Sequence, residues 1–320
     1  MMLLTEKICI CGGIVMNAVV LLLQKVLPVF LVLGLGMLCR KKSLLTREGI
    51  NALKKVAVDI ALPAVMFSAF ATAEYSVKSI CVPLAMFAVC LAALFLGFRL
   101  CRWLKIGGRL SPFLAAGFEA GMLGYALFAI LFPQEPVSSF AMVDLGQVLF
   151  VFTVYKILLA GKNNARDALK EALSAPTVWA ILLGLLFGAT GLFDALHASG
   201  ISRIITAATD FVSAPTSVLI LLAIGYDLIP SQIQWKKVGR ITALRLCVSG
   251  VLLCAVLAVD RLLLGSMMHL GALLLMFILP PPFVLPVFAD VDSERADVSS
   301  ALSALTFVSI LLFAVLATVF

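Results

Sequence analysis

A single carboxylate lies in a glycine-rich and otherwise apolar stretch, where ionisable side chains are rare. Glu119 has Gly117, Gly121 and Gly124 close to it within residues 112–132, which are largely hydrophobic. A charge inside an apolar segment of membrane-spanning length is unfavourable unless it is paired, protonated or hydrated, and this makes the residue a functional candidate. Glu119 is therefore expected either to carry a proton while an anionic solute binds, or to accept hydrogen bonds from backbone donors as a structural carboxylate.

A run of three prolines interrupts a second apolar stretch. Pro280, Pro281 and Pro282 lie within residues 267–289 and remove three backbone donors, so a helix cannot continue through them. Backbone groups freed at membrane depth are tolerated only against protein or a water-filled cavity. Interrupted helices at corresponding places in the two halves of a chain are typical of a transporter's binding site. The alternative is a pair of kinks that serve only helix packing.

A polar pair occurs in the apolar residues 138–160. One helical turn separates Asp144 from Gln147, so the two side chains share a face. They are expected either to contact the solute or a coupling ion, or to form hydrogen bonds between helices. The predicted solute-binding residues are thus Glu119, Gly121, Gly124, Asp144, Gln147, Pro280, Pro281 and Pro282, with Glu119 and Asp144 as the proton- or ion-coupling groups.

Two further sets of polar residues have simpler interpretations. Ser299, Ser303 and Thr306 share one helix face and are expected to allow close packing, although their hydroxyls can also serve a site. Asp59 follows Lys55 at the spacing of an ion pair on one helix face, which predicts a structural pair.

The chain has no residue pattern that suits enzyme or metal chemistry. His197 and His269 are too few and too far apart for a metal or nucleophile site, and Cys9 and Cys11 have no histidine or acidic neighbour at metal-ligand spacing. No phosphate-binding Gly-x-x-x-x-Gly-Lys-Ser/Thr sequence occurs. We therefore expect no enzymatic activity, no cofactor and no metal.

The composition requires a lipid environment. Hydrophobic residues make up 63% of the 320 residues and charged residues 13%, whereas soluble domains are about half apolar and a quarter charged. At ~20 apolar residues per crossing, the length suits about ten helices. An all-α membrane protein is therefore predicted, with spans at residues 19–39, 50–72, 78–98, 112–132, 138–160, 175–193, 203–226, 241–260, 267–289 and 298–320.

Lysines and arginines recur in clusters that predict the orientation of these spans. The clusters come after the first, third, fifth and seventh spans, and the intervening connections carry at most one basic residue each. Short loops rich in Lys and Arg stay in the cytoplasm, so both termini are predicted to face outward from the inner (cytoplasmic) membrane. The same location accounts for the net charge of +7 without nucleic-acid binding. The cluster members are Arg40, Lys41, Lys42, Arg47, Arg99, Arg102, Lys105, Arg109, Lys156, Lys162, Arg166, Lys170, Lys236, Lys237, Arg240 and Arg245.

Two proline pairs suggest that the halves of the chain are related. Pro28 in the first span has a counterpart in Pro176 of the sixth, and Pro63 in the second has one in Pro215 of the seventh. Because five spans per half is an odd number, the second copy would insert from the opposite side, as an inverted repeat. The predicted organisation is an N-terminal extension or misassigned start at residues 1–15, a first repeat at 16–160, a cytoplasmic linker at 161–174 and a second repeat at 175–320.

Several segments resemble the auxin efflux carrier family. They read VLPVFLVLGLGMLCRKKSLL and VAVDIALPAVMF near the start, FEAGMLGYALFAILF at 118–132, and MFILPPPFVLPVFADVDSERADVSSALSALTF at 276–307. The resemblance covers residues 16–320 and implies ten helices in two inverted five-helix repeats, with helices 4 and 9 broken and crossing at the site. It also implies a scaffold of helices 1, 2, 6 and 7 and a transport domain of helices 3–5 and 8–10.

One departure from the family concerns the site itself. This chain has Glu119 where many relatives have Asn, and Ala126 where Pro is usual. The crossing is therefore expected to depend on glycine in the fourth span and mainly on proline in the ninth.

Together these features predict a secondary carrier. The resemblance implies that it moves small organic anions such as dicarboxylates by alternating access, and Glu119 suggests proton coupling. A channel or uniporter for a small solute and a membrane sensor that does not transport remain alternatives. Beyond the solute and the lipid bilayer, the resemblance implies pairing of scaffold helices as a route to a homodimer.

Overall fold

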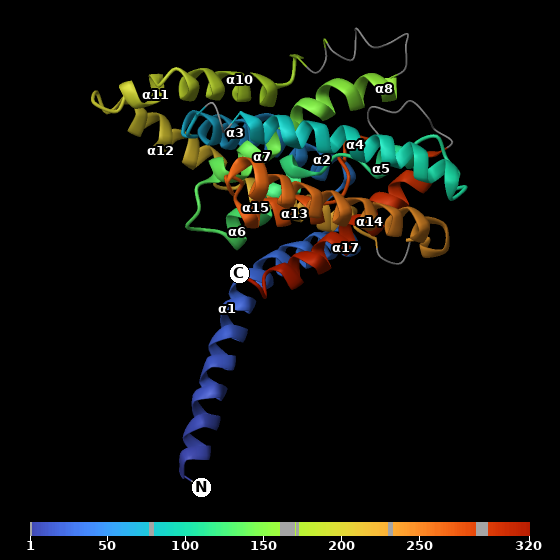
Figure 1. Cartoon of the computed structure of the whole chain (residues 1–320), viewed down its shortest axis with the longest axis horizontal. Coiled ribbons are helices and arrows are strands. Elements are labelled where there is room, and N and C mark those ends of the chain that lie inside the picture. Colours follow the sequence, from blue (N-terminus) through green and yellow to red (C-terminus); the bar gives the residue numbers. More distant parts are fainter. Residues whose placement is uncertain (1, 77–79, 161–169, 171–172, 230–232, 286–293) are drawn as a thin grey trace.

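The described part of the chain is helical throughout (Figure 1). The structure is a computed structural model that describes residues 2–76, 80–160, 170, 173–229, 233–285 and 294–320, and no strand occurs in these ranges. The helices lie alongside one another in one body, from which the N-terminal part of α1 (Met2–Lys41) projects. By length and composition, six described stretches can cross a membrane: Leu23–Lys41, Cys81–Trp103, Val137–Leu159, Ile201–Asp227, Val238–Leu264 and Asp297–Leu316.

Helices occur at each of the first five predicted spans. α1 covers the first span and also includes residues 2–15 of the predicted extension. The second span consists of α2 (Arg47–Val56), a π-helical turn (Ala57–Ala61) and α3 (Leu62–Ala71), and the third is α4 (Cys81–Trp103). The fourth is broken into α5 (Ser111–Leu114), a π-helical turn (Ala120–Gly124) and α6 (Tyr125–Leu131). The fifth consists of α7 (Val137–Phe150), a π-helical turn (Val151–Tyr155) and α8 (Lys156–Ala160).

Helices also occur at the last five predicted spans. The sixth span is α10 (Pro176–Ala189), followed by the short α11 (Leu192–Ala195), and the seventh is α12 (Ile201–Ser213) with α13 (Thr216–Asp227). The eighth is α14 (Trp235–Val259) with a π-helical turn (Asp260–Leu264), the ninth begins as α15 (Leu270–Ile278), and the tenth is α17 (Arg295–Leu316). The end of the predicted ninth span, residues 286–289, lies outside the described residues, as does most of the predicted linker.

Glycines let neighbouring helices approach closely. α1 packs on α13, and a Cβ added to Gly36 would overlap the carbonyl oxygen of Leu222. In the same way, α4 packs on α7, where a Cβ added to Gly146 would overlap the carbonyl oxygen of Pro83. α10 also packs on α3, and α14 on α17. Small residues at such contacts are the usual means by which helices associate within a membrane.

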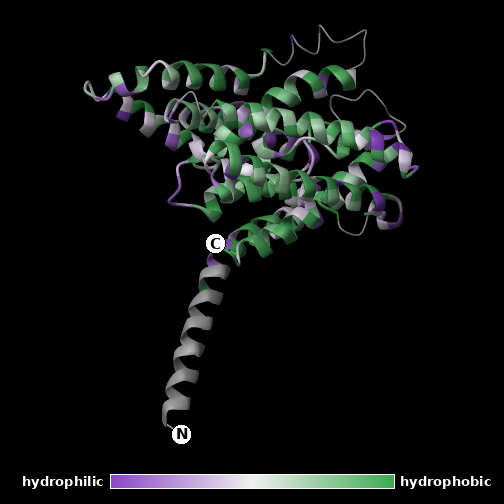
Figure 2. Ribbon diagram, in the orientation of Figure 1, coloured by the Kyte–Doolittle hydropathy of each residue, from purple (hydrophilic) through white to green (hydrophobic). Residues whose placement is uncertain are grey.

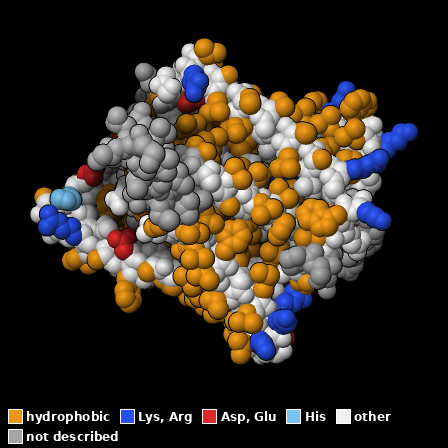
Figure 3. Space-filling view, turned by 90° about the horizontal axis from the view of Figure 1, so that it is seen from below, with side chains coloured by type: hydrophobic (Ala, Val, Ile, Leu, Met, Phe, Trp, Pro, Cys, Tyr) orange, Lys and Arg blue, Asp and Glu red, His pale blue; other side chains and the backbone are white. Residues whose placement is uncertain are grey.

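Polar residues concentrate at the ends of the helices, and apolar ones cover the length between them (Figures 2 and 3). At one end, which we call the basic end, Glu294 accepts hydrogen bonds from the N–H groups of Arg109 and Leu110, and the N–H of Gln234 donates to Ser300. The end of α1 and the start of α2 contact the end of α13 through the pairs Arg40–Tyr226 and Arg47–Asp227.

The opposite end holds the C-terminus. Lys25 donates to the carbonyl of Phe320 at 2.8 Å, and the ring of Phe132, just after α6, lies 5.0 Å from that of Phe320. Segments far apart in sequence therefore meet at two separate ends of the helical body.

Candidate functional site

The interruption of the fourth predicted span lies against the triple proline. The backbone N–H of Glu119 donates to the carbonyl of Pro280 at 2.8 Å. Gly117 has a φ of +69°, and a Cβ there would lie 2.8 Å from Cγ of Pro282. Both observations require glycine at this position, because other residues rarely adopt such a φ and none would fit.

Glu119 also joins the two breaks through its side chain. One carboxylate oxygen accepts a hydrogen bond from the N–H of Met122 at 3.0 Å. The other accepts from the N–H of Phe283, the first backbone donor after the prolines. The side chain is 7% exposed and lies at the start of a helical turn, where free N–H groups favour a carboxylate. The backbone-bonded role expected for Glu119 is therefore present in the structure, while its contact with a solute or proton remains a prediction.

We call the place where the two breaks meet the junction. A buried arginine of a third helix also contacts it. Arg245 of α14 donates to the carbonyl oxygens of Leu114 at 2.9 Å, Gly117 at 2.8 Å and Leu279 at 2.9 Å. Its guanidinium carbon also lies 5.4 Å from the centre of the Phe118 ring. Since these carbonyls belong to both breaks, one side chain supplies the donors that the interrupted helices lack.

Arg245 corrects the interpretation of the basic clusters. The sequence placed it among loop residues that signal topology, but its side chain is 2% exposed and lies within α14. Lys156 of α8 is likewise buried. Arg245 falls inside the predicted span 241–260. The reasoning that made Glu119 a functional candidate, namely the cost of a charge within an apolar span, therefore applies to Arg245 as well.

Asp144 and Gln147 form a buried network with Tyr125. The tyrosine hydroxyl donates to one oxygen of Asp144 at 3.1 Å, and the Gln147 amide donates to the other at 3.2 Å. The same amide donates to the carbonyl of Phe118 at 2.7 Å, which links α7 to the first break. Within the described part of the chain, Oε1 of Gln147 has no hydrogen-bond partner although it is buried.

A cavity of about 850 Å³ lies beside the junction. Its walls include four of the predicted binding residues: Glu119, Gly121, Gln147 and Pro282. The other four are buried but do not line the cavity, namely Gly124, Asp144, Pro280 and Pro281. Ser299, Ser303 and Thr306, for which packing was the expected role, also line the cavity. Further wall residues come from α1, α2, α3, α10 and α13.

The predicted pair of Lys55 and Asp59 is replaced by a different ion pair. Among the described residues no salt bridge joins these two, whereas Lys54 pairs with Asp227 at the end of α13. The π-helical turn Ala57–Ala61 explains the difference, because its extra residue per turn changes the alignment that an i,i+4 pair requires. Asp227 was not among the candidate residues of the sequence.

Comparison with known proteins points to transport. Residues 21–171 match the model of a family described as "Membrane transport protein". Over 177 residues, the chain is 27% identical to a protein of Methanothermobacter thermautotrophicus named "Uncharacterized transporter". The aligned part is 53% of this chain and 58% of that relative, so the similarity spans somewhat over half the length of each.

Proposed function

Residues 21–171 belong to the membrane transport protein family, that of the auxin efflux carriers, and from this premise we propose that the chain is a secondary carrier for small organic anions. The observation that carries the proposal is the contact between two interrupted helices beside a cavity that both line. Interrupted helices offer backbone groups and the positive ends of short helices to a bound anion. The open acceptor on Gln147 adds a polar group that a solute can use.

The pattern of helix packing supports two inverted repeats. If the first five spans are equivalent to the last five in order, the contact of α3 with α10 has α13 with α1 as its counterpart, and both contacts are present. The contact of α4 with α7 corresponds to that of α14 with α17, and both of these are present as well. Exchanging the two halves therefore turns the α3–α10 contact into the α13–α1 contact, and the α4–α7 contact into the α14–α17 contact. A two-fold relation between the halves would require this.

The contacts at the two ends of the body support ten crossings. The connections after the first, third, seventh and ninth predicted spans take part in contacts at the basic end. The start of the first span, the end of the fourth and the C-terminus meet at the opposite end. Alternating crossings place these segments in this way, and the excess of Lys and Arg assigns the basic end to the cytoplasm.

Three ionisable groups near the junction support proton coupling. Arg245, Glu119 and Asp144 are all buried, and their formal charges sum to −1 if all three are ionised. An anionic solute would add a further negative charge to a site that excludes most water, which is unfavourable. Uptake of one proton together with the anion removes this cost, and of these three groups only Glu119 lines the cavity.

Uptake into proteoliposomes tests the proposal. Radiolabelled succinate, malate and citrate would be offered with and without an inwardly directed proton gradient. We expect saturable uptake with counterflow that the gradient accelerates, and we expect Glu119→Gln to retain uptake but lose the acceleration. Linear flux would instead indicate a channel, and binding without flux a sensor.

A matched control separates this effect from a general change in charge. Glu74 is exposed and lies outside the cavity wall, so Glu74→Gln removes the same charge away from the site. The coupling role is rejected if the Glu119 variant keeps the gradient dependence of the Glu74 variant.

A further inference from the structure

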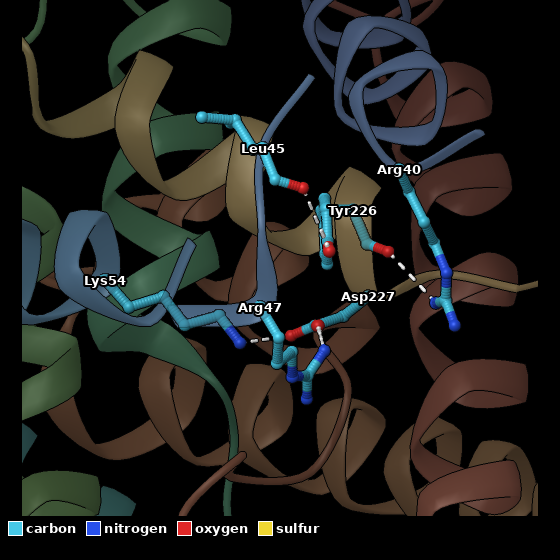
Figure 4. A network of polar contacts seen from close by, with 6 residues as sticks. All are labelled: Arg40, Leu45, Arg47, Lys54, Tyr226 and Asp227. Carbon is cyan, nitrogen blue, oxygen red and sulfur yellow. Dashed lines mark hydrogen bonds and ion pairs between the residues drawn. The ribbon is translucent and has the colours of Figure 1, made fainter. Parts of the chain in front are cut away.

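Three cations and one carboxylate lie close together on the cavity wall, and two of the cations contact the carboxylate (Figure 4). Arg47 donates to one oxygen of Asp227 at 2.5 Å, and Lys54 contacts the other. Arg40 donates to the backbone carbonyl of Tyr226, the residue before Asp227, at 3.2 Å. All three cations and Asp227 line the cavity. We call these four residues the mouth cluster.

The cavity wall connects the mouth cluster with the junction. Lys54, Val58 and Leu62 all line the cavity. A Cβ added to Gly121 at the junction would lie 3.5 Å from Leu62. Leu62 lies eight positions after Lys54 along the helix, a rise on the order of 12 Å. The cluster is therefore distinct from the junction, but the two share one cavity.

The charges of the cluster do not balance. Three cations and one carboxylate of the cluster line the cavity, so this part of the wall has an excess of positive charge. Side chains of the Arg47–Asp227 pair are 58% and 34% exposed, and ion pairs exposed to this extent are weak enough to exchange partners. An arginine and a lysine that already hold a carboxylate have the geometry to hold another.

We propose that the mouth cluster is a first binding site for the carboxylate group of an anionic solute, at which Asp227 acts as a tethered competitor. An arriving carboxylate takes the place of the Asp227 side chain between Arg47 and Lys54. It then leaves along the wall formed by Lys54, Val58 and Leu62 toward the junction. Once the solute has left, Asp227 pairs again with Arg47 and Lys54. This competition prevents the two cations from retaining the solute.

Neighbouring residues show that the cluster is more than a signal for membrane topology. Lys41 and Lys42 are exposed in the same connection, and neither is part of the cavity wall. Either would satisfy the preference for basic residues in a cytoplasmic loop. Only the cations with access to the cavity can act on a solute, so Lys42 provides a control of the same charge.

The inference rests on the proposed function for its solute, and a binding measurement separates the two. Succinate would be added to the purified protein in detergent at low ionic strength, and the shift in melting temperature compared with that caused by uncharged dimethyl succinate. We expect a shift with succinate alone. Lys54→Gln and Arg47→Gln should remove most of it, whereas Lys42→Gln should keep it and Asp227→Asn should increase it.

Flux gives a second measurement on the same variants. In proteoliposomes, Lys54→Gln should raise KM for succinate about threefold or more and Asp227→Asn should lower it, with both effects reduced by high salt because salt screens the charges. Equal behaviour of Lys54→Gln and Lys42→Gln in both measurements overturns the inference. If Asp227→Asn does not fold, the comparison of the three cation variants decides. Binding through the cluster without any flux in the unaltered protein would instead overturn the proposed carrier.

Discussion

Arg245 shows how one residue can complete two broken helices. Its three hydrogen bonds go to carbonyls at the two breaks, where the regular helices end. A planar guanidinium can donate in several directions at once, whereas an ammonium group is smaller and reaches fewer fixed acceptors. The charge alone is therefore insufficient at this position, and the shape of the group matters.

Arg245→Lys is expected to destabilise the protein although it keeps the charge. Each buried carbonyl that loses its donor costs about 1–3 kcal/mol. Thermal unfolding in detergent should show a lower melting temperature, and uptake should fall with it. Arg240→Lys is the control, because Arg240 is exposed on the same helix. Equal melting temperatures for the two variants would show that the junction does not depend on the guanidinium.

The sequence predicted some residues of the site and missed others for a physical reason. Glu119 and the prolines are recognisable locally, because a carboxylate or an imino acid is unusual in any apolar helix. The partners of Arg245 and Asp227 are not local: Arg245 is 131 residues from Leu114, and Asp227 is 173 residues from Lys54. Only the packing of the helices brings them together, so a single sequence gave no spacing from which to infer either contact.

At the scale of helices, breaks were easier to predict than ends. The interruptions in the fourth and ninth predicted spans follow from backbone chemistry, and the structure has both. The predicted sixth span continued to residue 193, but α10 ends at Ala189, and Gly191 follows with a φ of +68°, which interrupts the helix. Hydropathy continues through such a turn, so it does not mark the end of the helix.

Gly146 is expected to be essential for the contact between α4 and α7. An added methyl group would overlap the carbonyl of Pro83, and separating the helices to make room should cost roughly 1–3 kcal/mol. Gly146→Ala should therefore lower the melting temperature. Gly250→Ala provides the contrast, because no atom lies within 4 Å of a Cβ at that position of α14. There alanine should be neutral or stabilising, since it favours the helix; the same loss in both variants would refute the packing argument.

The predicted topology of the whole molecule can be tested by finding which side of the membrane each end of the helical body faces. In a background with the eight native cysteines replaced, Lys42→Cys introduces a thiol at the basic end and Ser266→Cys introduces one in the connection before α15. A membrane-impermeant maleimide applied to intact cells should label Ser266→Cys only, and Lys42→Cys should react after permeabilisation. Labelling of both from the same side would contradict an alternating arrangement of the spans between them.

In the proposed carrier with two inverted repeats, the paired contacts would have an energetic consequence for alternating access. When α3 on α10 and α1 on α13 are equivalent contacts, a shape open to one side of the membrane and a shape open to the other can be built from interchangeable parts. Two such shapes differ little in free energy, and each 1.4 kcal/mol by which a mutation or a gradient favours one of them changes the ratio about tenfold. A substitution that strengthens one contact and leaves its twin unchanged should therefore trap the molecule facing one way, even though it makes the protein harder to unfold.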